Sequence, residues 1–369
     1  MWLNQIAKSW SDYICREETF NFFDEFDKYK MISRFEILDF NWSFISHRDR
    51  LLYENQTSEA TIHNLIETNF KSLISKSGRR VYYSLYSSGS EPSSPLESQQ
   101  IACSNQNLYI RTTEFSDTHD RILQHRDGEY SPLLEDITGY HHLLQQDNCD
   151  RLIILQSHEY SGYKTQITAA MQCIGYSPEQ FHFIPIQPLK LYAFHRENNK
   201  VHPIPDLPLG ELQKVVNPQT IRWYSLRVPL EEIAPLNLST SSPEHPQNHF
   251  YRIQLAYAYT QKYLTLLKSH HLDSENTSET TPTNPEEQNL IDTLQSTEQI
   301  LDRAIDEVAP HLICQHVEQI SEQFLEWLPP KRWSPSSYAT LQKVHDVLLD
   351  LVESKLGLTL MPIQYQAVS

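Results

Sequence analysis

The chain has 369 residues, enough for two or three domains, and its hydrophobic content of 39% with 11% aromatic residues is ordinary for a folded globular protein. Its net charge of −17 is the opposite of the basic balance that a dedicated nucleic-acid binder usually carries. It contains only eight glycines, and neither G-x-G-x-x-G nor G-x-x-x-x-G-K-[ST] occurs. Because backbone phosphate cradles need glycine for tight turns, this composition argues against a nucleotide-hydrolysing enzyme of a familiar kind.

The sequence also bears on the compartment. No segment approaches the roughly 18 apolar residues of a membrane span, and the first twenty residues do not resemble a signal peptide. Five scattered cysteines form no C-x-x-C pair, which predicts reduced thiols. We therefore expect a cytoplasmic protein with no membrane partner.

Residues 1–238 mix strand and helix signals. The segments RVYYSLY (80–86) and NLYIRTT (107–113) are rich in β-branched and aromatic residues, which predicts strands. Further on, RLIILQ (151–156), the helical segment 162–176 and FHFIPIQPLKLY (181–192) read as strand, helix and strand. This order predicts a βαβ unit of a parallel sheet.

Three polar, turn-rich segments divide the chain. Residues 87–100 and 273–288 are predicted loops, and STSSPEHPQNH (239–249) is predicted to link two domains. Residues 1–238 would then form an α/β domain, and residues 250–369 an all-helical domain without internal repeats.

Apolar spacing after residue 250 predicts four helices. The third is PHLICQHVEQISEQFLEW (310–327), whose apolar residues recur at steps of four, three, four and three. The second is expected to run unbroken from Leu290 to Val308. The fold class is thus α/β followed by all-α.

No local signature of catalysis or metal binding stands out. The pair His158-Glu159 lacks the second histidine of H-E-x-x-H, the other paired histidines have no cysteine at ligand spacing, and G-x-S-x-G is absent. We predict no catalytic residues, no metal site and no cofactor.

Aromatic and basic residues alternate at three places, as in sites where unstacked bases stack on rings and cations meet phosphates. The candidate RNA-binding residues are Arg252, Tyr257, Tyr259 and Lys262 on the first helix of the helical domain, Lys331, Arg332 and Trp333 in a loop, and Lys76, Arg79 and Arg80 before a strand. The alternative is that Tyr257 belongs to the core and the cations are merely solvated. Residues 245–369 hold eight basic and sixteen acidic residues, a net of −8. Any RNA binding should therefore be weak and salt-sensitive.

The helical domain resembles the C-terminal DALR anticodon-binding domain of arginyl-tRNA synthetases. The likeness lies in the third helix, which begins Pro310-His311 and keeps the apolar register through Phe324, and in the first helix, where Gln254, Ala256 and Ala258 stand in a family motif Gln-Tyr-Ala-His-Ala-Arg. The family's His and Arg are tyrosines here, Tyr257 and Tyr259.

The α/β part resembles the second half of the same family's catalytic domain. LYIRTTEFSDTHDRILQHRDGEY (108–130) is similar to the family's Thr-x-x-Phe-x-Asp-x-x-Asp-Arg-x-Leu run and Asp-Gly-x-Tyr turn. The resemblance implies a remnant of a class I synthetase Rossmann-like catalytic domain, followed by a DALR-like helical bundle.

The departures from the family concern its catalytic motifs. His-x-Gly-His occurs nowhere, and the chain is expected to begin downstream of it. Where the Lys-Met-Ser-Lys-like loop is expected, Lys200 has no Ser-Lys context, and of a Gly-Ala-Asp-His-His-Gly-Tyr motif only Gly162-Tyr163 remains. Adenylate formation needs cations placed on the transition-state charge, so the resemblance implies no aminoacylation here.

The sequence thus predicts a truncated, non-catalytic paralogue that binds tRNA or another structured RNA. A protein–protein adaptor that has lost RNA binding is the alternative, because tyrosine and tryptophan also favour protein interfaces. A homodimer formed through an exposed sheet edge is a further expectation. Residual binding of arginine or a nucleotide is the weakest alternative.

Overall fold

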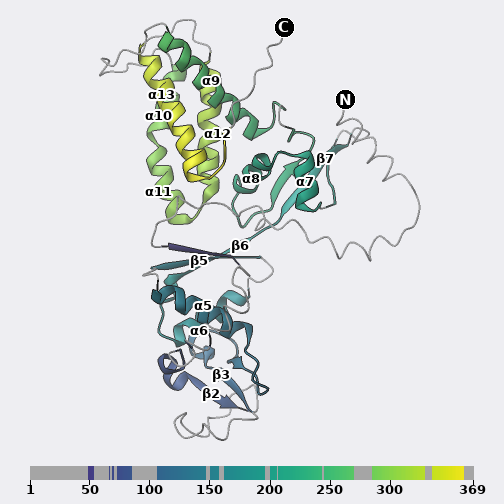
Figure 1. Ribbon diagram of the computed structural model, residues 1–369, viewed down its shortest axis with the longest axis vertical. Helices are drawn as coiled ribbons and strands as arrows, with labels where there is room; N and C mark the ends of the chain where they lie inside the picture. Colours follow the sequence, from purple (N-terminus) through teal and green to yellow (C-terminus); the bar gives the residue numbers. More distant parts are fainter. Residues whose placement is uncertain are drawn as a thin grey trace, which may run out of the picture.

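The computed structural model describes residues 49–53, 66, 69, 73–84, 106–146, 150–157, 162–195, 200–205, 207–242, 245–269, 285–328 and 335–360. These residues form an elongated molecule with an α/β lobe at one end and a helical bundle beside a second small sheet at the other (Figure 1). A short parallel sheet lies between the two ends.

The α/β lobe is built on an antiparallel sheet, in which β3 lies between β2 and β4. Its elements are η1 (Gly78–Arg80), β2 (Val81–Ser84), β3 (Asn107–Ile110), η3 (Thr112–Phe115), β4 (Arg121–Gln124), α5 (Pro132–Gln146) and α6 (Tyr163–Cys173). The two strands predicted from β-branched and aromatic residues are confirmed, although the second ends at Ile110.

The central sheet is parallel, with β5 between β1 and β6. Its strands are β1 (Asp49–Tyr53), β5 (Arg151–Ser157) and β6 (Phe181–Ile186), and the chain crosses from β5 to β6 through α6 and η5 (Pro178–Gln180). The predicted βαβ unit is therefore confirmed. Alternate residues of β5 face opposite ways: Leu152 and Ile154 join the core of the α/β lobe, whereas Ile153 and Leu155 join the core at the other end.

The expectation of one strand over residues 181–192 is wrong. The chain breaks at Gln187-Pro188 and enters a separate sheet, where β7 lies between β8 and β9. A proline has no backbone N–H to donate to a sheet and is tolerated on an edge strand, as Pro185 is in β6; after Ile186 the chain leaves the sheet, and the Gln187 N–H donates to the Leu230 carbonyl oxygen at 2.9 Å. The elements of this region are β7 (Leu189–His195), β8 (Lys200–Pro203), α7 (Leu209–Val215), α8 (Pro218–Leu226) and β9 (Ala234–Asn237).

The helical bundle surrounds α12. Its elements are α9 (His249–Ser269), α10 (Pro285–Gln295), α11 (Thr297–Glu307), α12 (Pro310–Trp327), α13 (Pro335–Leu349) and the π-helical turn η6 (Asp350–Lys355). The central helix α12 contacts α8, α9, α10, α11 and α13, and Ile313, Val317, Ile320 and Phe324 are fully buried on it. The third predicted helix is confirmed with its bounds.

The expectation of an unbroken second helix is wrong, because the segment is divided into α10 and α11 at Ser296. The Ser296 hydroxyl donates to the Thr293 carbonyl oxygen at 2.7 Å, and the Thr297 hydroxyl donates to that of Leu294 at 2.8 Å. Hydroxyl groups that bond to the preceding turn compete with helical hydrogen bonds and bend the chain. The spacing of apolar residues gives no information about these hydroxyl hydrogen bonds, so it could not predict the break at Ser296.

Two hydrophobic cores hold the described residues together. The smaller core fills the α/β lobe, and the larger core runs without a break from β5 and β6 through β7, β9 and α8 into the bundle. The larger core therefore continues across residues 239–249, where the sequence predicts a domain boundary. That boundary stays a prediction.

The described cysteines Cys173 and Cys314 are buried free thiols. Among the described helices, none is long and apolar enough to cross a membrane, and no group of three or more metal-ligating side chains occurs within the same residues.

Candidate nucleic-acid interface

Helix α9 carries the first group of candidate RNA-binding residues. Its N-terminus is fixed by Asn248, whose side-chain oxygen accepts from the backbone N–H groups of Phe250 at 3.1 Å and Tyr251 at 3.4 Å. This is the arrangement that favours Asn before a helix. The apolar side of α9 packs into the larger core, so the opposite side of the helix faces outward.

Four residues on the outward side recur at helical spacing: Arg252, Tyr259, Lys262 and Tyr263, here called the α9 stripe. The rings of Tyr259 and Tyr263 lie 6.1 Å apart at an interplanar angle of 33°, and both are partly buried against the larger core. Lys262 is exposed. The stripe thus presents two adjacent rings flanked by cations, which suits an unstacked nucleotide chain.

Tyr257 lies on the buried side of the same helix. It is 6% exposed, and its ring stacks on His345 of α13 with centroids 5.1 Å apart. Its hydroxyl accepts from the Gln261 side chain, and burial raises the pKa of Tyr257 above its ordinary value. Tyr257 therefore occupies a core position, as the alternative reading of the sequence holds, and stands apart from the α9 stripe.

Arg252 connects α9 to α12. Its Nη1 lies 2.8 Å from Oε1 of Glu322, and the two side chains are 37% and 47% exposed. An ion pair this open to water contributes little to stability, so Arg252 can exchange its partner.

The other candidate cations lie elsewhere. Lys76, Arg79 and Arg80 directly precede β2 in the α/β lobe, and β2 lies at the opposite end of the molecule from α9 (Figure 1). Arg80 pairs with Glu114 at 3.0 Å and lies over the Phe115 ring at 5.2 Å. The structure does not bring these residues together with the α9 stripe.

Lys76 and Arg79 are exposed, and the Lys76 ammonium lies 5.9 Å from the centroid of the Tyr176 ring. The third candidate group, Lys331, Arg332 and Trp333, lies outside the described residues.

A partly buried polar cluster, absent from the sequence-based candidates, joins α8 to α12 behind the start of α9. Glu318 accepts three hydrogen bonds: from Arg227 Nε at 2.8 Å, from Arg227 Nη2 at 3.0 Å and from Trp223 Nε1 at 2.9 Å. His249 Nδ1 lies 3.3 Å from the same carboxylate. Burial alone would raise the pKa of Glu318, but the hydrogen bonds from His249 and Arg227 outweigh it and lower the pKa to about 2. The carboxylate is therefore ionised at neutral pH.

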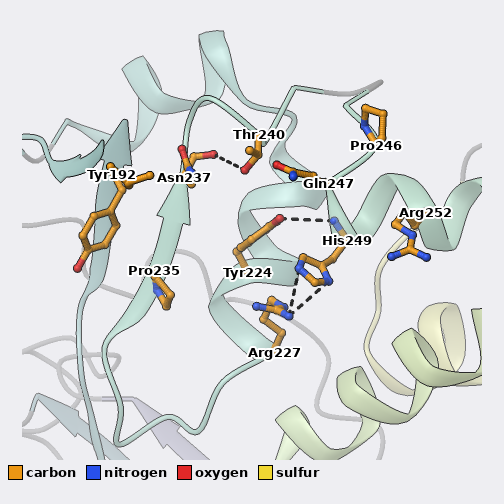
Figure 2. Close-up of a pocket in the computed structure, with 11 residues that line it drawn as sticks. Tyr192, Tyr224, Arg227, Pro235, Asn237, Thr240, Pro246, Gln247, His249 and Arg252 are labelled. Atoms are coloured by element: carbon orange, nitrogen blue, oxygen red, sulfur yellow. Dashed lines mark hydrogen bonds between the residues drawn. The ribbon is translucent and has the colours of Figure 1, made fainter. Parts of the chain in front are cut away.

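A pocket of about 610 Å³ opens in front of this cluster (Figure 2). One wall is formed by β7, β8 and β9, and the other by α8 and the start of α9. Its lining residues are Tyr192, Val201, Tyr224, Arg227, Pro235, Asn237, Thr240, Pro246, Gln247, His249 and Arg252. Of these only Arg252 was a candidate. The spacing of Tyr224 and Arg227 at the end of a short helix is a local signal for that pair alone, in which the arginine lies over the ring at 5.5 Å; it does not indicate the other lining residues.

Two residues retained from the catalytic motifs of the resemblance lie at the start of α6. Gly162 directly precedes the helix, and Tyr163 is its first residue. Burial is the main cause that raises the pKa of the Tyr163 hydroxyl well above its ordinary range. Lys200 is the first residue of β8 and pairs with His195 in the β7–β8 hairpin.

The architecture described above is that of a synthetase-like α/β body with a helical anticodon-binding bundle. Residues 253–358 match the family model described as the DALR anticodon binding domain. The arginine–tRNA ligase of Mesoplasma florum is 22% identical over 258 residues, which cover 70% of this chain and 45% of that one. The enzyme of Oceanobacillus iheyensis is 26% identical over 216 residues, 58% of this chain and 39% of that one.

Solved structures give the same fold. A putative arginyl-tRNA synthetase from Campylobacter jejuni superposes with a TM-score of 0.64 at 15% identity, covering 83% of this chain and 63% of that one. The Thermus thermophilus arginyl-tRNA synthetase gives 0.61 at 13% identity, covering 85% and 60%. The chain is arginyl-tRNA synthetase-like and carries a DALR anticodon-binding domain. It spans less than half the length of the curated relatives it matches.

Proposed function

We propose that this chain binds tRNA, or another structured RNA, through the α9 side of its DALR domain and does not catalyse aminoacylation. The observation that carries the RNA-binding part is the α9 stripe on the outer face of that domain, where the rings of Tyr259 and Tyr263 lie side by side, Lys262 directly precedes Tyr263 and Arg252 lies nearer the start of the helix. We place this activity in the cytoplasm, in keeping with the free thiols of Cys173 and Cys314.

The non-catalytic part rests on residues inside the chain. The family's second ATP-binding motif is expected after β7, and there the chain turns back into β8, whose first residue, Lys200, lacks the Ser-Lys context. Without cations placed on the transition-state charge, adenylate formation loses a main stabilising contribution.

The test of RNA binding is fluorescence anisotropy with labelled total tRNA and with purified arginine tRNA, at roughly 50 and 200 mM salt. We expect binding at the lower salt that weakens at the higher salt. A chain that leaves both tRNAs free at the lower salt would contradict the proposal. Arginine-dependent exchange of pyrophosphate into ATP, measured on the same sample, should stay at background, and exchange above background would remove the non-catalytic part alone.

A protein-binding role is the second candidate, favoured by one specific observation. Phe194 on β7 and Val201 on β8 pair across the hairpin, and they are 43% and 48% exposed. Exposed apolar groups that adjoin one another mark many protein interfaces. If this pair joins two copies of the chain, sedimentation should show a dimer that Phe194→Asp dissociates; a monomer at all concentrations would exclude that form of the alternative.

A further inference from the structure

The pocket between the β7–β9 sheet and the start of α9 has the size and chemistry of a ligand site that the α9 stripe does not explain. Its volume of about 610 Å³ lies within the usual range for small-ligand pockets. Among the described residues, its lining includes two arginines and a histidine and no carboxylate, while Glu318 and Glu322 pair with the two arginines from outside the lining. On a chain with a net charge of −17 such a lining favours an anionic ligand.

The two arginines play different parts. Arg227 is held by both oxygens of Glu318 and lies over the ring of Tyr224, so its guanidinium is fixed and its charge is compensated. Within the part of the chain that the structure describes, the ion-pair partner of Arg252 is the solvent-exposed carboxylate of Glu322. A guanidinium in that position can turn to a phosphate and bind it with two parallel hydrogen bonds.

The strand side of the pocket offers a surface for a base. Tyr192 on β7 and Pro235 on β9 lie at the opposite side from His249 and Arg252 (Figure 2). The ring of Tyr224 is less suitable, because Arg227 lies over it at 5.5 Å and His249 meets it edge-on at 6.0 Å. Tyr192 is therefore the ring on which a base would stack, and the amide side chains of Asn237 and Gln247 supply donors and acceptors nearby.

We infer that this pocket receives one unstacked, phosphate-bearing nucleotide of the RNA bound by the DALR domain, with its phosphate on Arg252 and its base on Tyr192. This inference rests on the proposed function. Arg252 belongs both to the pocket and to the α9 stripe, and Lys262 lies about 15 Å further along the same helix. An RNA strand that follows the stripe toward the start of α9 reaches the pocket directly.

The experiment uses adenosine and cytidine 5′-monophosphate as probes, titrated into the full chain and followed by calorimetry or ligand-observed NMR. The matching nucleosides serve as ligands without a phosphate. We expect saturable binding of the monophosphates, weaker binding of the nucleosides, and displacement of the monophosphates by tRNA.

Two substitutions should change the affinity in opposite directions. Arg252→Ala should weaken monophosphate binding about tenfold, because it removes the phosphate partner. Glu322→Gln should strengthen it by roughly two- to fivefold, because it removes the carboxylate that competes for Arg252. A general loss of structure cannot produce a gain. The matched control is the exposed pair of α11, with Arg303→Ala and Glu307→Gln expected to change nothing.

Each remaining outcome overturns the inference. If tRNA binds while the monophosphates do not, or if Arg303→Ala weakens their binding as much as Arg252→Ala, the pocket is not a nucleotide site and the proposed function stands. If the monophosphates bind but tRNA does not displace them, the pocket serves a free nucleotide. If neither monophosphates nor tRNA bind, both proposals fail together.

Discussion

Arg227 and Glu318, which are 91 residues apart in the sequence, form a two-point hydrogen-bonded ion pair that fastens α8 to the central helix of the bundle. The side chains are only 21% and 15% exposed. Removing one partner of such a pair leaves a poorly hydrated charge behind, which typically costs about 3 to 5 kcal/mol.

Glu318→Ala should therefore lower the free energy of unfolding at pH 7 by about 3 kcal/mol or more, measured by urea denaturation. The lowered pKa of Glu318 stabilises the folded state above pH 4.5, and this contribution is lost as the pH falls from about 4.5 toward about 2. The difference between wild type and variant should shrink over that interval. A matched control is Glu307→Ala on the exposed face of α11, which should change little.

His141 predicts a second, separate pH dependence. The residue is fully buried in α5, with Nδ1 2.7 Å from the Tyr176 hydroxyl. Burial first, then the nearby charges of Lys76 and His142, lower the pKa of His141 from 6.5 to about 4. Because the pKa of His141 is lower in the folded than in the unfolded state, the unfolded state binds a proton first as the pH falls. The folded state is therefore most stable above about pH 6.5, and this stability is lost progressively between about pH 6.5 and pH 4.

We therefore expect the melting temperature to fall by about 2 to 3 °C between pH 7 and pH 5 through this group, with a smaller fall in His141→Gln. His142→Gln should retain most of the wild-type dependence, because burial is the largest cause of the lowered His141 pKa and the charge of His142 comes after that of Lys76. Equal pH profiles for wild type and His141→Gln would show that another group governs this window.

The α9 stripe predicts which tyrosines matter for RNA. Tyr259→Ala should weaken tRNA binding about tenfold, because loss of one stacking ring costs roughly 1 to 3 kcal/mol. Tyr257→Phe, on the buried side of α9, should leave the affinity unchanged. Anisotropy titrations of both variants decide this, and the reverse pattern would contradict the assignment of the binding face.

Lys262 should affect the salt dependence more than the specificity. If its ammonium meets a phosphate, Lys262→Ala should reduce the slope of log affinity against log salt by roughly 0.7 to 0.9. Affinities for total and arginine tRNA should fall by the same factor. An unchanged slope would exclude a phosphate contact at this position.

The buried thiols should resist modification. Burial raises the pKa of Cys173 to about 12 and that of Cys314 well above its ordinary value. Since the thiolate is the reactive form, both should stay unlabelled by iodoacetamide at pH 8 in the native protein and react fully in urea. Peptide mapping by mass spectrometry identifies the two sites, and rapid native labelling of either would contradict its burial.

Several features of the fold could be predicted because they depend on local pattern. The apolar spacing of α12 and the strand–helix–strand order around α6 both follow from residues adjacent in sequence or on one helix face. The division at Ser296 was missed because hydroxyl groups bonded to the preceding turn leave the apolar spacing intact. The break at Pro188 was missed because the flanking segments are both strand-like.

The candidate site shows a similar limit. Helical spacing separates the outward Tyr259 from the buried Tyr257, but the sequence alone left Tyr257 open between core and contact. The pocket could not be predicted, because it gathers residues from β7 to α9 and depends on the pairing of Arg227 with Glu318. The residues around Arg227 in the sequence do not indicate that it pairs with Glu318, and those around Glu318 do not indicate the reverse.

The central parallel sheet has a consequence for any attempt to divide this chain. Because alternate residues of β5 and β6 serve different cores, the sheet is a shared wall: one side closes the α/β lobe and the other closes the larger core. A fragment that includes the central sheet exposes the face of the sheet that packs against the missing half. A fragment that lacks the sheet exposes the core that the sheet would have covered. We therefore expect the backbone amides of Leu152 to Leu155 to exchange with solvent among the slowest in the protein, and either half expressed alone to associate through the uncovered apolar surface.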